Sequence, residues 1–537
     1  MDTDVCICGF KVRHWRTLTC VVLVVAASWG ARQIAAAAWK SVVGYRTPYT
    51  FHQTLPPGTP LARRVILIVL DGVRLDLSQR MPFLNSLRRQ GADGVAVVGQ
   101  PSLSNPGRAV MVTGAWQEVH GVTFNSGYNP ITVDTVFSLA RTAGMKTAVS
   151  GSGFWQTNFG PLGAETFPRY PKELHGAAPE AYVEYQKRTC ADLPALVRNS
   201  PAQFLALDLN AMDDASHDLG PLSEGAAKVL LQVDRCLQDV AGAVDLRDTV
   251  LVATSDHGHI DTGGHGGTEE QVIRVPLVIS GGPVHSGVRL QAQQTDIAPT
   301  ICALLGLPFP ATNQGRVLLE TLDVPLQLLE PRLKEQVAAF RAFQTHLLGE
   351  PPEEARAHDQ RNRMLPAVTG SVMLLALCTG LLFAVLLDSQ ERRGALAGLA
   401  AFYVVYFGLF KLAGLAYSFS AVNREEYLPE FFLKNMLAAG AALAVAAFVT
   451  GWLIPACGLP GRPRIAAALT TLVIATVALQ LMAIYWINGI FMTYWMLDLS
   501  WGIQAYFALL AIHALGFAML LTPLTLYAGQ RLRSRTT

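Results

Sequence analysis

The distribution of apolar residues divides the chain into two kinds of region. Residues 64–325 alternate short apolar runs with polar stretches, whereas residues 365–528 are almost continuously apolar. A separate apolar run at 18–38 follows a group of basic residues near the N-terminus. Runs of about 20 apolar residues have the length that a helix needs to cross a bilayer. The pattern predicts a membrane anchor, a folded domain and a bundle of transmembrane helices.

The C-terminal region divides into about five predicted spans, which are separated by loops of alternating charge. The spans are 365–387, 395–421, 436–457, 465–487 and 503–528. Arginine pairs or clusters fall in every second loop, and such basic loops remain in the cytoplasm. The length of the N-terminal apolar run favours an uncleaved anchor over a cleaved signal peptide. This predicts an integral membrane protein with about six spans, in which the folded domain faces outward.

The predicted segments follow one another in a simple order. They are a cytoplasmic N-terminus, a transmembrane signal anchor, a linker, the folded domain, an amphipathic or linker segment, the bundle and a basic cytoplasmic tail. In that order they occupy residues 1–16, 17–38, 39–63, 64–325, 326–364, 365–528 and 529–537.

Charge, glycosylation motifs and cysteines indicate which partners and which compartment to expect. The net charge of +2 gives no sign of the basic domain that nucleic-acid-binding proteins carry, so no nucleic-acid partner is expected. The predicted outward domain has no Asn-x-Ser/Thr glycosylation acceptor, which favours a bacterial inner membrane over the endoplasmic reticulum. Cys190 and Cys236 are able to form a disulfide in such an oxidising compartment.

Within the folded domain, six short apolar runs have the character of buried strands. They are 65–70, 94–98, 146–150, 203–209, 249–254 and 276–280. Helical stretches lie between them at 81–90, 133–143, 180–199 and 224–244. Strands that alternate with helices predict an α/β domain, in which helices cover both faces of a mostly parallel sheet. An all-α transmembrane bundle follows it. Ligands of such sheets bind beyond the carboxyl ends of the strands.

Carboxylates and imidazoles gather just after these predicted strand ends. The group is Asp71, Asp213, His217, Asp256, His257 and His265. Each residue alone is more often part of a plain turn or a solvated surface. Together they offer the oxygen and nitrogen ligands that suit zinc, and two such sets are able to hold two ions for displacement at phosphorus. Ser104 lies at the same predicted edge.

These residues and their neighbours resemble the alkaline phosphatase superfamily. The resemblance is carried by Leu-Asp-Gly-Val-Arg at 70–74, Ser-Asn-Pro-Gly-Arg at 104–108, the Asp213-x-x-x-His217 pair, Ser-Asp-His-Gly at 255–258 and Gly-His-Gly at 264–266. The match is most similar to the phosphodiesterase/nucleotide pyrophosphatase branch and to the glycosylphosphatidylinositol ethanolamine-phosphate transferases. These transferases also combine one N-terminal span, an outward catalytic domain and a bundle of spans.

The resemblance implies a site for two Zn²⁺ ions or another divalent metal pair. It assigns metal one to Asp213, His217 and His265, and metal two to Asp71, Asp256 and His257. A hydroxyl that contacts a dication has a lowered pKa and attacks phosphorus more readily.

Other residues at this edge are assigned to the phosphate ester. The resemblance implies that Ser104 is the nucleophile, in contact with metal two, and that Asn125 binds a phosphate oxygen. Arg108 and Trp155 are expected to contact the substrate, although packing in the core is an equal alternative for Trp155. His259 has no matching role in the family and is expected at the solvated surface.

The implied activity is transfer of a phospho-alcohol, such as phosphoethanolamine, from a membrane lipid to an acceptor hydroxyl outside the cytoplasm. The additional spans favour transfer because a hydrolase needs only one anchor. The alternative is a membrane-tethered phosphodiesterase or nucleotide pyrophosphatase that transfers to water. Arg108 stands where both subfamilies commonly have His, and Ser-x-Pro-x-Arg also resembles the sulfatase signature. The Asp71-Gly72 pair and the two-metal ligand set argue against a sulfatase, and the complete set argues against an inactive scaffold.

Overall fold

The computed structural model describes residues 5–325 without 8–9, 13–14, 48, 50, 127–129 and 169–173, scattered positions between 327 and 345, and residues 387–536 without 456, 458–460 and 489–498. Contacts divide the chain into two compact units. The sheet unit contains 42–355 and 418–424, and the helical unit contains 1–41, 356–417 and 425–537.

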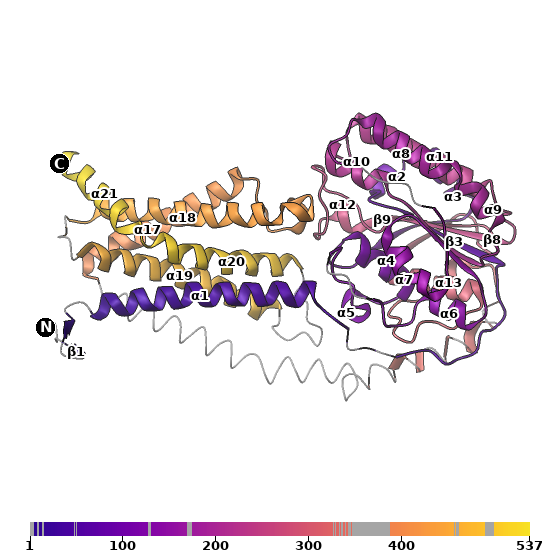
Figure 1. The fold of residues 1–537 in the computed structure, drawn as a ribbon, viewed down its shortest axis with the longest axis horizontal. Coiled ribbons are helices and arrows are strands. Elements are labelled where there is room, and N and C mark those ends of the chain that lie inside the picture. Colours follow the sequence, from indigo (N-terminus) through magenta and orange to yellow (C-terminus); the bar gives the residue numbers. More distant parts are fainter. Residues whose placement is uncertain are drawn as a thin grey trace. The chain divides into compact units, whose positions relative to one another are not determined.

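The sheet unit is built on one eight-stranded sheet (Figure 1). In spatial order its strands are β10 (Val288–Gln293), β4 (Ala92–Val97), β9 (Arg274–Ser280), β8 (Thr249–Thr254), β3 (Arg64–Leu70), β7 (Phe204–Leu209), β5 (Thr147–Ser150) and β6 (Glu165–Thr166). All neighbours are parallel, except that β9 is antiparallel to β4 and β8. The predicted α/β fold with a mostly parallel sheet is confirmed. All six predicted strands are present, whereas β6 and β10 were not predicted.

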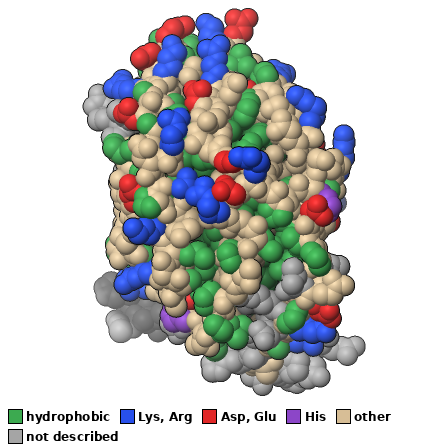
Figure 2. Space-filling model, turned by 90° about the vertical axis from the view of Figure 1, so that its right-hand side faces the viewer, with side chains coloured by type: hydrophobic (Ala, Val, Ile, Leu, Met, Phe, Trp, Pro, Cys, Tyr) green, Lys and Arg blue, Asp and Glu red, His purple; other side chains and the backbone are tan. Residues whose placement is uncertain are grey.

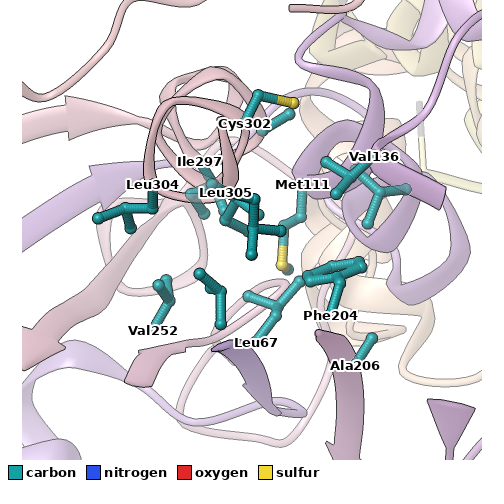
Figure 3. Packing of buried hydrophobic residues seen from close by; sticks show 14 of the residues in the cluster. Leu67, Met111, Val136, Phe204, Ala206, Val252, Ile297, Cys302, Leu304 and Leu305 are labelled. Atoms are coloured by element: carbon teal, nitrogen blue, oxygen red, sulfur yellow. The ribbon is translucent and has the colours of Figure 1, made fainter. Parts of the chain in front are cut away.

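Both faces of the central strand β3 are buried. Leu67 and Val69 pack in one hydrophobic cluster, and Ile66 and Ile68 pack in another on the opposite face. Figure 3 shows Leu67 facing side chains of α13 (Ile297–Leu305) in the first cluster. A strand that is apolar at every position is the pattern of a parallel sheet with two covered faces.

Helices supply the covers on both faces (Figure 1). The first cluster includes residues of α4 (Ser104–Thr113), α6 (Val136–Thr142), α7 (Gly153–Phe159) and α13. The second includes residues of α3 (Pro82–Gln90), α8 (Pro179–Ala191), α9 (Leu193–Asn199), α10 (Ala211–Leu219) and α11 (Glu224–Ala241). The predicted helix 180–199 is thus two helices, which are separated at Asp192, and Cys190 in the last turn of α8 forms a disulfide with Cys236. Other short elements are the strands β1 (Val5–Ile7) and β2 (Phe10–Val12), and the helices α2 (Leu75–Ser78), α5 (Gln117–His120) and α12 (Glu270–Ile273).

The described helices of the helical unit are long and apolar. They are α1 (Trp15–Val43), α17 (Ser389–Leu412), α18 (Leu428–Leu453), α19 (Gly461–Asn488), α20 (Leu499–Ala518) and α21 (Thr522–Thr536). Within the described residues, four helices can cross a membrane, or five spans exist if α20 and α21, bent by 67°, form one. By length and composition, these helices are of the kind found in integral membrane proteins. The predicted span 365–387 and most of the predicted segment 326–364 lie outside the described residues.

The helix α17 ends before the span that the sequence predicts there. The predicted span continues to residue 421, whereas α17 ends at Leu412 and a short 3₁₀ helix occupies Phe419–Val422. Gly414 adopts a positive φ of 70°, which follows the helix end and stops the helix from continuing. Residues 418–424 then belong to the sheet unit.

Surface charge is mixed on the face of the molecule that Figure 2 draws. Lys and Arg side chains lie among Asp and Glu side chains there, with apolar side chains between them. Charges of opposite sign that are interspersed in this way produce no strong field of a single sign.

Candidate metal centre and nucleophile

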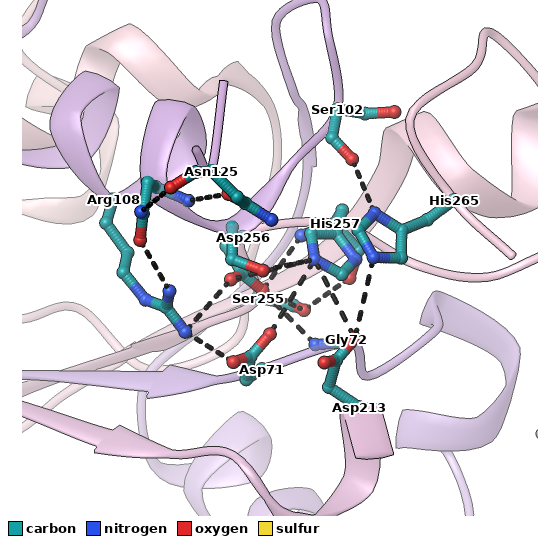
Figure 4. Close-up of polar contacts among 12 residues, drawn as sticks. Asp71, Gly72, Ser102, Arg108, Asn125, Asp213, Ser255, Asp256, His257 and His265 are labelled. Carbon is teal, nitrogen blue, oxygen red and sulfur yellow. Dashed lines mark hydrogen bonds and ion pairs between the residues drawn. The ribbon is translucent and has the colours of Figure 1, made fainter. Parts of the chain in front are cut away.

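The site lies at the carboxyl ends of β7, β3 and β8, where Figure 4 shows Asp71, Asp213 and His257 close together. Asp71 follows β3, and Asp256 and His257 follow β8. Asp213 and His217 lie one turn apart on α10, which follows β7. The three strands are parallel neighbours, so their carboxyl ends meet at one edge of the sheet. The fold therefore brings five of the predicted ligands to one place.

His265 joins this edge from a glycine-rich segment and completes the first ligand group, which is Asp213, His217 and His265. The Nε2 atom of His265 lies 3.2 Å from Nε2 of His217 and 3.7 Å from Oδ1 of Asp213. The Nε2 atom of His217 is 3.4 Å from the same Asp213 oxygen. One carboxylate oxygen and two imidazole nitrogens thus converge at the spacing of a metal site.

Asp71, Asp256 and His257 form the second ligand group. The Nε2 atom of His257 is 3.6 Å from Oδ1 of Asp71 and 3.8 Å from Oδ2 of Asp256. The ligand atoms of this group all lie within 4.8 Å of one another. The two groups adjoin, because the rings of His257 and His265 stack with their centroids 3.7 Å apart.

Four histidine rings in this site share one hydrogen-bonding arrangement, in which Nδ1 faces an oxygen that can only accept. The acceptors are the carbonyl oxygens of Gly258, Ser102 and Gly263 for His257, His265 and His259, and the side-chain oxygen of Asn423 for His217. Each Nδ1 therefore carries the proton and donates it. Each Nε2 is left with a lone pair that points into the site, the arrangement typical of metal-ligating histidines.

This arrangement fits a bound cation. The Nε2 lone pairs of His217 and His265 face each other at 3.2 Å without a proton between them. In the second group, Oδ1 of Asp71 and Oδ2 of Asp256 are buried and accept no hydrogen bond. Lone pairs and carboxylate oxygens that converge without donors are stabilised by a cation, and this mixture of nitrogen and oxygen ligands suits zinc.

His259 belongs to this site, so its predicted place at the solvated surface is wrong. Its side chain is fully buried, and its Nε2 atom lies 3.0 Å from Oδ1 of Asp213. A side chain at Gly72, which has a φ of +72°, would come within 2.6 Å of that nitrogen. Glycine at position 72 therefore leaves the space for His259. The spacing His257-x-His259 directly after a strand was the available signal.

Arg108 lies among the carboxylates of the second group. Its Nη2 atom is 3.0 Å from Oδ2 of Asp208 and 3.6 Å from Oδ2 of Asp256, and it also donates to Asp71. One guanidinium thus faces three buried carboxylates, which leaves an excess of negative charge. A buried charge without a counterion is strongly unfavourable, so this excess favours a divalent cation nearby. The guanidinium of Arg108 is itself buried.

Burial sets the protonation of the ligand groups. It lowers the pKa of His217 to about 4 and the pKa of His265 well below its ordinary value, so both rings are neutral at neutral pH. Burial and the nearby charge of Asp256 raise the pKa of Asp71 well above its ordinary range. Metal ligands must be deprotonated, so the histidines are ready to bind while Asp71 needs a cation to hold its charge.

Ser104 is the first residue of α4, and its hydroxyl lies beside the second group. Its Oγ atom is 3.1 Å from Nε2 of His257. The side chain of Asn125 lies next to it, where Oδ1 accepts the backbone N–H of Asn105 at 2.9 Å. The Asn125 amide nitrogen is thereby left as the donor. Trp155 lies apart from this group: its ring is fully buried in the core, and its indole N–H donates to Asp208 at 3.3 Å.

The chain is similar to several known proteins. Residues 65–294 match the family model described as type I phosphodiesterase / nucleotide pyrophosphatase. The catalytic subunit of human GPI ethanolamine phosphate transferase 2 is 25% identical over 292 residues, which cover 50% of this chain and 29% of that protein. GPI ethanolamine phosphate transferase 1 of Schizosaccharomyces pombe is 26% identical over 344 residues, which cover 53% of this chain and 36% of that protein.

The matches to both relatives therefore cover only about a third of those proteins' length. Among solved structures, murine ectonucleotide pyrophosphatase / phosphodiesterase 5 has 14% sequence identity and a TM-score of 0.37. That match covers 45% of this chain and 95% of the murine protein.

Proposed function

We propose that the chain transfers a phospho-alcohol from a lipid donor to an acceptor hydroxyl, because residues 65–294 match the type I phosphodiesterase / nucleotide pyrophosphatase family model. The chain is a phosphoryl-transfer enzyme of the alkaline phosphatase superfamily held in a membrane. Phosphoethanolamine is the proposed group, and a glycan is the proposed acceptor, because the curated relatives are ethanolamine phosphate transferases.

One observation carries the proposal: the Ser104 hydroxyl lies at the N-terminus of a ten-residue helix, 3.1 Å from a histidine of the second ligand group. Backbone N–H groups at a helix N-terminus bind phosphate oxygens, and the helix dipole favours their negative charge. A phosphodiester bound there has its phosphorus next to Oγ of Ser104. The amide nitrogen of Asn125 is placed to donate to one of its oxygens.

The residues of the chain then divide the reaction into two displacements. Oγ of Ser104 gives up its proton and forms a bond to phosphorus as the bond to the donor lipid oxygen breaks, and that departing oxygen takes up a proton. In the second displacement the acceptor hydroxyl gives up its proton and forms a bond to phosphorus, the bond to Ser104 breaks, and the Ser104 oxygen regains a proton. Two divalent ions, held by the first and second ligand groups, would lower the pKa of the Ser104 hydroxyl and balance the charge on the departing oxygen.

We propose that the sheet unit faces the outer side of the membrane, with a bacterial periplasm favoured, and that the chain has about six spans. The alternating charge of the loops and the missing glycosylation acceptors support this orientation. The alternative activity is transfer to water, as in the phosphodiesterase and nucleotide pyrophosphatase enzymes that give the family its name.

The test is mass spectrometry of the intact, detergent-purified protein after incubation with total membrane lipid and zinc. The wild type is compared with Ser104→Ala and with the matched control Ser86→Ala, whose hydroxyl donates to the Phe83 carbonyl oxygen on α3. We expect an added mass equal to phosphoethanolamine on Ser104 in the wild type and the control, and none in Ser104→Ala. Rapid release of a phosphate monoester without an acceptor favours the hydrolase, and the absence of both adduct and turnover overturns the catalytic proposal.

A further inference from the structure

The segment 418–424 belongs to the sheet unit, although the helices on either side of it in the sequence, α17 and α18, belong to the helical unit. We call this segment the inter-span loop. It contacts the residues around two predicted metal ligands. Arg424 forms an ion pair of 2.7 Å with Asp218, the neighbour of His217, and the Ser420 hydroxyl accepts the N–H of Gly267 at 3.0 Å.

Asn423 of the inter-span loop forms two hydrogen bonds with His217. Its Oδ1 accepts the Nδ1–H of His217 at 2.8 Å, and its Nδ2 donates to the His217 carbonyl oxygen at 3.0 Å. The second bond fixes which end of the amide is oxygen, and the first fixes the tautomer of the ring. The Nε2 lone pair of His217 is therefore turned toward Asp213 and His265.

His217 differs in this respect from the other histidines of the site. His257, His259 and His265 donate to backbone carbonyl oxygens of the same domain. The acceptor for His217 is a side chain that lies 206 residues further along the sequence. Replacing it removes an oxygen without altering any backbone next to the ligands.

The backbone of Asn423 is held in an unusual conformation. Its φ of 66° is the only positive φ of a non-glycine residue among the described residues. The N–H of Arg424 donates to the carbonyl oxygen of Val422 at 2.9 Å, which closes a three-residue γ-turn around it. This turn is rare and strained, and such strain persists where the surrounding structure holds it, often at functional sites.

The glycines around His265 leave the space for the inter-span loop. A side chain at Gly264 would overlap the carbonyl oxygen of Ser420 and approach Cα of Asn423 to 3.0 Å. A side chain at Gly266, which has a φ of +104°, would come within 2.8 Å of the Phe419 ring. The glycine-rich segment is therefore shaped to receive this loop as well as to present His265.

We propose that Asn423 is a positioning residue for His217, so that the loop between two membrane helices completes the first metal-binding group. The inference rests on the proposed function, since it takes Asp213, His217 and His265 as metal ligands. Partners that orient ligating histidines typically contribute a factor of about 10–100 to metal affinity. This role depends on the side-chain oxygen of Asn423, which accepts the Nδ1–H of His217. A residue that only filled space in the loop would not need that oxygen.

The test measures metal affinity in the full-length protein in detergent, stripped of metal and titrated with zinc against a chromophoric chelator. Asn423→Ala is expected to weaken one of two zinc sites by about 10–100-fold and leave the other unchanged. Asn423→Asp keeps an acceptor for Nδ1–H and is expected to restore affinity. Gly264→Ala displaces the loop and is expected to reproduce the loss. Asn85→Ala removes a side-chain amide on α3 that donates to the Gln79 carbonyl oxygen, and it serves as the matched control.

Two further measurements distinguish a failure of the proposed role of Asn423 from a failure of the proposed metal centre. His217→Ala defines the complete loss of one site, and the visible spectrum of the cobalt-substituted protein reports ligand geometry directly. A changed cobalt spectrum in Asn423→Ala, restored in Asn423→Asp, supports the positioning role. If Asn423→Ala binds both ions as the wild type does, while His217→Ala loses one, this inference alone is overturned. If the wild type binds no divalent ion, the proposed metal centre is overturned as well.

Discussion

The second ligand group is fixed by the sheet itself, whereas the first is assembled from three separate segments. Asp71, Asp256 and His257 follow two adjacent parallel strands directly, so the hydrogen-bonded ladder determines their spacing. The first group combines a helix and a glycine-rich segment, and its His217 is oriented by the inter-span loop. Sites on strand ends are positioned with little freedom, while sites on loops depend on what holds the loops. Substitutions that change buried charge should therefore affect the second group most. Substitutions that remove contacts of the surrounding loops should affect the first group most.

Arg108→Met tests the charge that supports the second group and carries the largest expected effect. The substitution leaves Asp71, Asp208 and Asp256 without their guanidinium. We expect the free energy of unfolding of the metal-free protein to fall by about 3–5 kcal/mol, because one partner of a buried ion pair is removed. Denaturant unfolding of the sheet unit, followed through its tryptophan fluorescence, measures the change.

Divalent ions should recover part of the stability that Arg108→Met loses, because they supply the missing positive charge. A matched substitution at the exposed Arg63, which pairs with Asp248 at the surface, should change the unfolding free energy by less than about 1 kcal/mol. Equal effects of the two substitutions would contradict the assignment of buried charge to the second group.

His259→Gln tests the first group. The Nε2 atom of the buried His259 lies 3.0 Å from Oδ1 of Asp213, so the substitution removes a nitrogen that adjoins the first group. We expect zinc affinity at one site to fall about 10-fold, with the second site unchanged. Competition titration with a chelator measures both sites in one experiment. A loss at both sites would show that the two groups are not independent.

Acidification should empty the two groups in a fixed order. The pKa of Asp71 is raised by burial and by Asp256, so protons compete for the second group at higher pH than for an ordinary carboxylate. The pKa of His217 is lowered to about 4, so protons compete for the first group only in more acidic solution. We expect the second site to release its ion first as pH falls, with half-release points separated by at least about one pH unit.

The sign of the stability change follows from the same shifts. The folded pKa of Asp71 lies above its unfolded value, so its contribution to the stability of the metal-free protein is present at low pH and is lost as pH rises through the folded pKa. The folded pKa of His217 lies below its unfolded value, so its contribution is lost as pH falls from about 6.5 to about 4. Zinc stoichiometry at stepped pH values measures the order of release, and the reverse order would contradict the comparison.

Trp155→Phe should have the smallest effect, because Trp155 contacts Asp208, which pairs with Arg108 and is not itself a predicted ligand. The substitution removes the indole N–H that Asp208 accepts, while a ring still fills most of the space. We expect a loss of about 1 kcal/mol in unfolding free energy, the ordinary contribution of one hydrogen bond. The KM for a phosphodiester should stay within about two-fold, and a larger rise in KM would support contact with the substrate instead.

The sequence predicted what local patterns determine. Six apolar runs became six strands, and the residues just after their ends converge because parallel strands share an edge. The strand β10 was missed because the run Val288–Gln293 alternates apolar and polar residues with one face exposed, as an edge strand does. Its pattern lacks the continuous apolar character that marks the central strands.

Two site residues depended on contacts that no local pattern records. His259 was predicted to be solvated because it lies in a polar segment. Its side chain is in fact buried, and it occupies the space that a side chain at position 72 would otherwise fill. Asn423 follows a predicted membrane span that in fact ends much earlier, and its grip on His217 depends on a fold that joins positions 206 residues apart. Partners this distant in sequence are set by tertiary packing.

The inter-span loop also has a consequence for the order in which a newly made chain becomes competent. During synthesis, His217 leaves the ribosome long before Asn423, and α17 must be placed in the bilayer between them. On the proposed role of Asn423, the sheet unit can fold with its second ligand group in place while its first group still lacks the residue that orients His217. Zinc would then be bound firmly only by chains whose membrane helices have been inserted. The hydrogen bonds between Asn423 and His217 would thus make metal binding depend on the prior insertion of α17 into the membrane.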